Sequence, residues 1–192
     1  MKIKLAFSLL LFFISASGLL AQEKFEKEYR LKTETVPLLA RQFVDSLPFN
    51  RRIKWYAEVS ELGKTVEAKT KFERRRYSVE FDSAGKLLDV EIGISFEDIP
   101  EKVRAEITRN LAAEFEKFSL KKIQEQLTGT RENLLAHLAQ GQQKAGLTTR
   151  YELIVKGSKD GEKHEFEFTF SAQGQQEKKA KLVFRNTDNL QY

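Results

Sequence analysis

Residues 77–107 constrain the fold more than any other part of this 192-residue chain. Apolar and polar residues alternate over 76–82 and again over 87–94, as in strands with one buried and one wet face. Residues 82–85 (DSAG) lie between them and favour a tight turn. From Asp98 onward apolar residues recur every four positions, which predicts a helix with one buried stripe. The stretch therefore predicts a β-hairpin that leads directly into a helix.

The alternation begins upstream of this hairpin. Residues 53–59 (IKWYAEV) and 65–73 alternate in the same way, with the turn ELGK at 61–64 between them. Four consecutive segments of period two joined by short turns are typical of an antiparallel meander.

The start of the helix carries its own signals. Asp98 and Glu101 fit a capping box, and Pro100 falls in the first turn, where its missing N–H costs nothing. We expect this helix to begin near Asp98 and to end near Lys117.

Parts of the plan recur along the chain. Phe166, Phe168 and Phe170 follow Tyr77, Val79 and Phe81 at a constant offset of 89, and Gly174 follows Gly85 at the same offset. Thr35-Val-Pro37 precedes Asp98-Ile-Pro100 at an offset of 63, which predicts a strand at 26–32 and a helix at 36–47. Further strands are expected at 118–127, 149–157, 162–170 and 175–184. Internal repeats of this kind indicate two units with a shared plan.

The predicted fold class is α+β, with two tandem helix-plus-antiparallel-meander units whose helices pack on one face of the sheets. The first unit covers 22–94 and the second 95–184, followed by a tail at 185–192. Residues 128–148 interrupt the second unit. We expect a short helix at 131–140 there, more often a lid over the core than a functional element.

The N-terminus has the pattern of a secretory signal peptide. Lys2 and Lys4 precede an apolar run, and small residues follow up to Ala21. The run is too short for a comfortable membrane span of about 20 residues, although a retained anchor is the alternative. The chain has no cysteine, so it lacks the residue that anchors a lipoprotein and can form no disulfide. We expect a periplasmic protein without a stable membrane anchor after cleavage at residue 21.

The charge of the chain argues against nucleic-acid binding. Without Lys2 and Lys4 the 33 basic residues exceed the 28 acidic ones by only three, and the two signs are interleaved. Nucleic-acid binders usually gather positive charge on one face. The basic run at 74–76 is interpreted as a solvated strand entrance.

The string FDSAGKLLDVEIGISFEDIPEKVRAEI at 81–107 resembles the PepSY-like family, also described as putative beta-lactamase-inhibitor-like. The matching features are Phe81-Asp82 with Gly85-Lys86-Leu87 at the hairpin, and Ile99-Pro100 with Val103 and Ile107 on the helix. In the second unit Ser171 and Gln175 stand where the motif has Asp82 and Lys86. The resemblance implies small exported proteins, mostly of unassigned function, whose helices cover one face of an antiparallel sheet.

The residues for chemistry are sparse. The two histidines, His137 and His164, are not spaced like metal ligands, and there is no glycine-rich phosphate loop. Helix capping explains the pair 97–98, and Glu165 and Glu167 fall on the solvated side of one strand. We therefore expect no catalytic residues, no metal, no cofactor and no enzymatic activity.

The remaining candidate is the polar face of the sheet. Our leading hypothesis is an exported, non-enzymatic protein-binding or inhibitory module that presents this face to another periplasmic or cell-envelope protein. Tyr56 among long charged side chains is the kind of residue that anchors an interface. The candidate partner-binding residues are Lys54, Tyr56, Lys69, Lys71, Arg76, Glu80, Glu165 and Glu167.

Three alternatives stay open. The face can be an ordinary solvated surface. The protein can be a carrier or sensor of a small apolar ligand held between sheet and helices. An enzyme would need a concave site with convergent carboxylates. The residues that would line the apolar space are Trp55, Phe72, Tyr77, Phe166 and Phe168.

Overall fold

A single curved sheet organises the molecule. The computed structural model describes residues 22–24, 26–60, 63–140 and 145–183. Within them, ten strands form one sheet in the order β1-β10-β9-β8-β7-β6-β5-β4-β3-β2. Every neighbouring pair is antiparallel except β1 and β10, which are parallel.

The elements follow the periodicity of the sequence. The strands are β1 (Gln22–Lys24), β2 (Glu26–Leu31), β3 (Lys54–Ser60), β4 (Gly63–Phe72), β5 (Arg75–Asp82), β6 (Leu87–Gly93), β7 (Lys117–Thr128), β8 (Thr148–Lys159), β9 (Glu162–Ser171) and β10 (Gln176–Leu182). The helices are α1 (Leu38–Asp45), α2 (Glu101–Glu114) and α3 (Arg131–Gln140), with short 3-10 turns η1 (Thr33–Thr35) and η2 (Phe96–Asp98).

The predicted fold class, with two separate units, is wrong. Strand β6 pairs with β7 from Val90↔Leu127 to Gly93↔Gln124, so the strands of both repeats lie in one continuous sheet. The physical reason is the free edge that β6 would otherwise present, because unpaired backbone groups at an edge seek a partner strand. Strand β7 supplies that partner with its C-terminal half, while nearly its whole length pairs with β8.

The helix starts differ from the predicted ones. Asp98 closes a capping box with Ser95 on η2, and Pro100 is the N-cap of α2. The proline ring fixes the φ angle of Pro100 directly before the first residue of α2. The carboxylate of Asp98 accepts a hydrogen bond from the Ser95 backbone N–H at 2.9 Å. Helix α3 occupies the predicted residues, so the expected insertion helix is confirmed.

Two apolar clusters lie between helices and sheet. The first joins Phe43 of α1 and Leu134 of α3 to residues of β3, β4, β5, β6 and β7. The second joins Ile107 and Leu111 of α2 to residues of β8 and β9. On α1, Leu39 is 54% exposed, whereas its neighbour Ala40 is fully buried.

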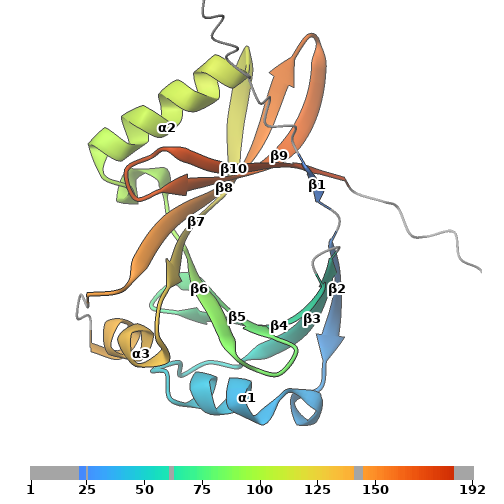
Figure 1. Ribbon diagram of the computed structural model, residues 1–192, viewed down its shortest axis with the longest axis vertical. Helices are drawn as coiled ribbons and strands as arrows, with labels where there is room; N and C mark the ends of the chain where they lie inside the picture. The colour runs from blue at the N-terminus through green and yellow to red at the C-terminus, as the bar shows by residue number, and fades with distance from the viewer. Residues whose placement is uncertain (1–21, 25, 61–62, 141–144, 184–192) are drawn as a thin grey trace, which may run out of the picture.

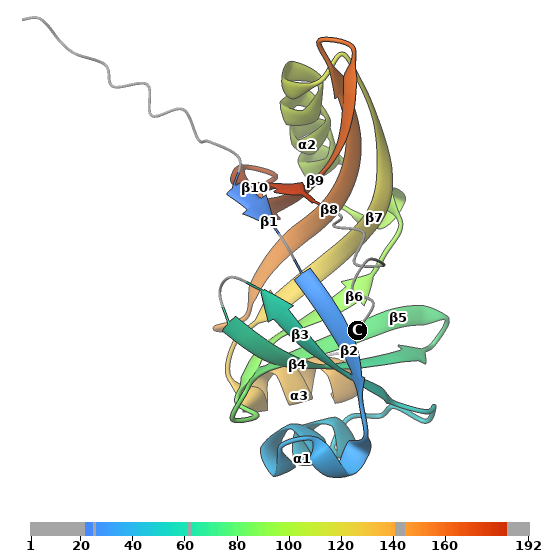
Figure 2. The same ribbon diagram turned by 90° about the vertical axis from the view of Figure 1, so that its right-hand side faces the viewer.

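The sheet curls strongly, so its two faces differ. Figure 1 shows it bending into an almost complete ring with α1, α2 and α3 on the outer side, and Figure 2 shows the same wall of strands from the side. We call the inner side the concave face. The two edge strands, β1 and β2, are neighbours in sequence although they stand at opposite ends of the strand order.

Two equivalent glycines allow hairpin turns of the sheet to pack closely against α1 and α2. Gly85 and Gly174 both have positive φ in hairpin turns. A Cβ at Gly85 would lie 2.7 Å from the Cβ of Pro37, and one at Gly174 would lie 2.9 Å from the carbonyl oxygen of Val103. Each turn therefore presses against the start of one helix, which explains why the offset of 89 preserves this residue.

The predicted signal peptide at 1–21 and tail at 185–192 lie outside the described residues. None of the helices in the described ranges combines the length and apolar composition that a bilayer-crossing helix requires.

Candidate functional site

The concave face gathers the candidate residues of the sequence. Directly paired residues share a face of a sheet, and the apolar residues of each strand point toward the helices. The pairs Lys54↔Lys69 and Lys71↔Arg76 therefore lie together on the concave side. Register and alternation place all eight predicted partner-binding residues on this face: Lys54, Tyr56, Lys69, Lys71, Arg76, Glu80, Glu165 and Glu167.

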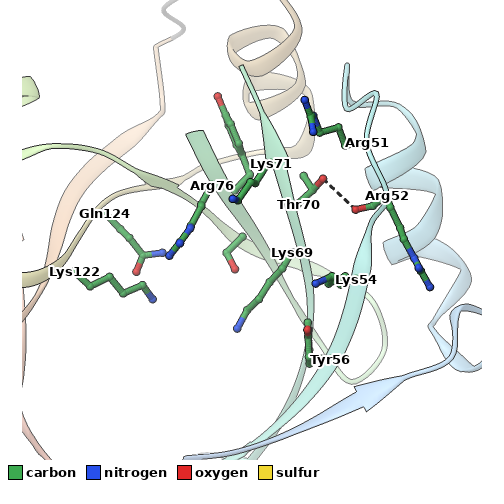
Figure 3. A pocket seen from close by; sticks show the side chains of 12 residues that line it. Arg51, Arg52, Lys54, Tyr56, Lys69, Thr70, Lys71, Arg76, Lys122 and Gln124 are labelled. Atoms are coloured by element: carbon green, nitrogen blue, oxygen red, sulfur yellow. Dashed lines mark hydrogen bonds between the residues drawn. The ribbon is translucent and has the colours of Figure 1, made fainter. Parts of the chain in front are cut away.

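Five of the eight line one pocket with a volume of about 590 Å³. Glu80, Glu165 and Glu167 are not among its lining residues. We call it the basic pocket, and Figure 3 shows its side chains reaching inward from several strands. Its lining residues are Arg51, Arg52, Lys54, Tyr56, Lys69, Thr70, Lys71, Arg76, Tyr77, Ser78, Lys122 and Gln124.

Three of the pocket's cations were not among the residues predicted from sequence. Arg51 and Arg52 precede β3, where Thr70 Oγ1 donates to the Arg52 carbonyl at 3.4 Å and ties this segment to β4 (Figure 3). Lys122 comes from β7, which its pairing with β6 places in the same sheet as β3, β4 and β5. Arg51 and Arg52 were visible as a basic pair beside a predicted strand, but Lys122 depended on the β6–β7 pairing.

Most of the pocket's positive charge has no internal counter-charge. Of its seven cations, only Lys69 forms ion pairs within the described part of the chain, with Glu28 at 2.5 Å and Glu67 at 2.9 Å. The other six form none with the residues described: Arg51, Arg52, Lys54, Lys71, Arg76 and Lys122.

Lys69 anchors the wall of the pocket. Burial alone would lower the pKa of its ammonium, but the hydrogen bonds to Glu28 and Glu67 outweigh burial and raise the pKa well above its usual value. The Nζ of Lys69 also stands 5.1 Å from the ring centroid of Tyr56. This cation–π contact holds the Tyr56 ring beside Lys69 in the lining of the pocket.

A network of carboxyl groups borders the basic pocket across Ser78 and Gln124. We call Asp89, Glu91 and Glu152 the carboxyl cluster. Gln126 Nε2 donates to Asp89 Oδ2 at 3.2 Å and to Glu152 Oε1 at 3.0 Å, and Gln124 Nε2 donates to Glu91 Oε2 at 2.7 Å.

Burial makes Asp89 and Glu152 hold their protons at unusually high pH. Asp89 is 8% exposed, and this burial, with the neighbouring charges of Glu80, Glu91 and Glu67, raises its pKa to about 8. Burial likewise raises the pKa of Glu152, to which Glu91 adds both charge repulsion and a hydrogen bond. Because an ionised Glu152 would be repelled by the Glu91 carboxylate, this neighbour favours the protonated form of Glu152.

The carboxyl cluster bears on the enzyme alternative, which requires convergent carboxylates in a concave site. A carboxyl protonated near neutral pH is able to act as a general acid. However, Asp89 Oδ1 is fully buried without a hydrogen-bond partner, and one oxygen each of Asp89, Glu91 and Glu152 accepts from Gln124 or Gln126. Gln124 and Gln126 thus donate to three of the six carboxyl oxygens of the cluster.

The histidines lie apart from the basic pocket. His164 borders a second pocket of about 290 Å³, with its Nε2 3.0 Å from Glu162 Oε2 and 3.3 Å from Lys181 Nζ. His137 is partly buried on α3. In the part of the chain that the structure describes, no group of three or more His, Asp or Glu side chains is arranged to hold a metal ion.

A β-bulge interrupts the period-two pattern of β6 next to the carboxyl cluster. In a regular strand Leu88 would share the apolar face with Val90. In the structure Glu80 pairs with Asp89 and Phe81 with Leu87, so Leu88 is the extra residue of a bulge and is 40% exposed. Glu91, Gln124 and Gln126 were visible only as polar positions that alternate with apolar ones.

Comparisons with known proteins define the fold and no more. No family model and no curated protein matches the chain. Among solved structures the chain is similar to a DUF2874 family protein from Bacteroides ovatus, with a TM-score of 0.51 and 11% sequence identity over 77% of this chain and 88% of that chain. At this identity the likeness concerns the fold alone. The resemblance to the PepSY-like family stays a prediction.

Proposed function

We propose that this protein is an exported binding module, and that its concave face binds a segment of a cell-envelope partner protein. The observation that carries the proposal is the convergence of Lys54, Tyr56 and Arg76, with the other pocket residues, on a volume of about 590 Å³. Pockets of roughly 300–1,000 Å³ are the size that ligand groups occupy. Export rests on the signal-peptide pattern at 1–21, and inhibition of the partner is one form that such binding takes.

An aromatic photo-crosslinker at Tyr56 tests this function. Tyr56 lines the pocket, so p-benzoylphenylalanine at this position should give a covalent adduct with a discrete partner in intact cells. Tyr29 is the matched control because it is 46% exposed and pairs with Ala57 on the helix side of the sheet. Adducts that are the same from both positions, or none from position 56, would overturn the proposal.

A charge reversal gives a second readout. Arg76→Glu, introduced beside the crosslinker, should abolish the adduct if the partner contacts the pocket, whereas Lys102→Glu on the outer helix α2 should leave it intact. Affinity capture with Tyr56→Ala should lose the same partner.

The apolar-carrier alternative has less support. Trp55 and Phe168 are 4% and 0% exposed and belong to the clusters that join the sheet to α1 and α2. Phe168 packs edge-on against Phe115, with ring centroids 5.9 Å apart. These side chains fill the space in which an apolar ligand would sit. A lipid or metabolite that co-purifies with the protein in native mass spectrometry would revive this alternative.

A further inference from the structure

In the basic pocket, positive side chains face each other across paired strands, and most of them have no ion-pair partner among the described residues. Lys71 and Arg76 face each other across β4 and β5, and Lys54 lies opposite Lys69 across β3 and β4. Like charges on facing residues destabilise a sheet pair. Lys69 is compensated by two carboxylates, but Lys54, Lys71 and Arg76 are not. An anionic occupant would convert this repulsion into attraction.

The spread of the cations indicates the size of that occupant. The unpaired side chains reach from β3 at Lys54 to β7 at Lys122, which is four strand spacings along the curved sheet. At about 4.8 Å per spacing the set spans about 19 Å. A small anion would meet two or three of these groups, whereas six residues of extended chain, at about 3.3 Å each, would run past all of them.

The borders of the pocket indicate how such a chain must be charged. In an extended segment alternate side chains point the same way, so acidic residues at every second position would all face the sheet. Arg76 suits a carboxylate through paired N–H donors, and the lysines act as point charges. Beyond Gln124 the chain would meet Glu91, which Gln124 holds at 2.7 Å. The favourable stretch therefore ends at Gln124.

We propose that the basic pocket binds an extended acidic peptide segment, with carboxylates at alternate positions set against Lys54, Lys71, Arg76 and Lys122. This inference rests on the proposed function and names the chemistry of the partner. The ring of Tyr56 and the alkyl stems of the lysines supply an apolar floor beneath the charges.

Fluorescence anisotropy of two labelled peptides tests the inference on the purified full chain. Glu-Ser-Glu-Ser-Glu-Ser should bind, with an affinity that falls as salt is added, and Gln-Ser-Gln-Ser-Gln-Ser should not. The double variant Lys71→Gln/Arg76→Gln should weaken binding about tenfold or more. The matched control Lys86→Gln/Lys102→Gln removes the same charge outside the pocket and should change binding less than about twofold.

Several results would overturn the inference. An equal loss in the control variant would mean attraction to overall charge. Equal binding of the glutamine peptide would remove the role of the carboxylates. Citrate or inorganic phosphate that matches the acidic peptide in affinity would make this a site for small anions. Thermal unfolding of each variant shows that it is folded, and the single variant Arg76→Gln replaces the double one if that fails.

The two proposals fail separately. A partner adduct from position 56 without acidic-peptide binding would overturn the inference and leave the proposed function standing. Acidic-peptide binding that depends on Arg76, without any adduct in cells, would support the chemistry of the pocket and overturn the proposed function.

Discussion

Asp89 shows how one buried carboxyl ties the stability of this protein to pH. Its pKa of about 8 in the folded chain exceeds the value of about 3.9 expected after unfolding. The folded state therefore binds more protons than the unfolded state between these pH values. The sign is opposite to that of an ion-paired aspartate, whose stabilisation is lost in acid.

The free energy of unfolding should consequently fall as the pH rises from about 4 to about 8, at up to about 1.4 kcal/mol per pH unit for one linked proton. The raised pKa of Glu152 acts in the same direction. Asp89→Asn mimics the protonated form and should flatten this dependence, making the variant more stable than the wild type at pH 8.5 by about 1 kcal/mol or more. Urea unfolding at several pH values measures this pH dependence of the free energy of unfolding.

Asp160→Asn in the exposed β8–β9 turn is the control for this prediction. Parallel curves of unfolding free energy against pH for Asp89→Asn and the wild type would contradict the assignment.

The equivalent turn residues Asp82 and Ser171 perform one task with different chemistry. Asp82 Oδ1 accepts hydrogen bonds from the backbone N–H groups of residues 84 and 86 at 2.9 and 2.8 Å. Ser171 Oγ accepts from those of residues 173 and 175 at 3.2 Å each. Serine in place of aspartate at this repeat position therefore preserves the turn with weaker bonds.

Ser171→Asp should strengthen that turn. An ionised acceptor makes shorter and stronger hydrogen bonds, and Arg150 is the direct cross-strand partner of position 171. We expect a gain of about 0.5–1 kcal/mol in the free energy of unfolding and, for Ser171→Ala, a loss of about 1 kcal/mol. Chemical denaturation measures both. If aspartate proves no better than alanine, the side-chain bonds do not hold the turn.

At the scale of elements, strand β8 has a glycine, Gly157, where it packs against the C-terminal end of helix α2. A Cβ at Gly157 would lie 2.4 Å from the ring of Phe115, the buried residue that caps α2. The ring thus covers the strand backbone directly, and the strand can approach the helix end only because position 157 has no side chain.

Gly157→Ala should therefore destabilise the protein by about 2 kcal/mol or more through overpacking. Gly93→Ala in β6 is the control, because its nearest contact would be an ordinary 3.5 Å to the Cβ of Arg76. Phe115→Leu should relieve the strain, so the double variant should cost less than the sum of the two single changes. Thermal unfolding measures all four; additive losses would contradict the contact.

The elements were more predictable than their arrangement. The strands β2 to β10 and the helix α3 fall where period-two and apolar patterns predict them, because those patterns record which side chains face a core. Strand β1 has three residues and pairs only with β10, so no local pattern announces it. The β6–β7 pairing was missed because hydrogen bonds between backbones leave little trace in side-chain identity. Hence Lys122 and the carboxyl cluster could not be assigned to the site from sequence.

At the scale of the whole molecule, the β6–β7 pairing makes the two repeats depend on each other. A chain of residues 22–94 should fold poorly as a monomer, because β6 would lose β7 and expose a free edge with Val90 and Ile92 beside it. We expect this half to elute as oligomers in size-exclusion chromatography while the full chain elutes as one species. Gly93→Lys in the half chain should restore monomers by charging the edge. A monomeric, cooperatively unfolding half without that change would show that the units are independent.

The placement of β1 and β2 at opposite edges of the sheet also sets an order of events in time. Gln22 of β1 pairs with Ala180 of β10. Strand β1 is therefore synthesised early but cannot pair until β10, near the other end of the chain, has been synthesised. Closing so long a loop costs more chain entropy than any hairpin of the meander, and non-local pairings of this kind slow folding. The hairpins should therefore form early and the two ends of the ring should meet last, which makes arrival at the finished concave face a late kinetic step.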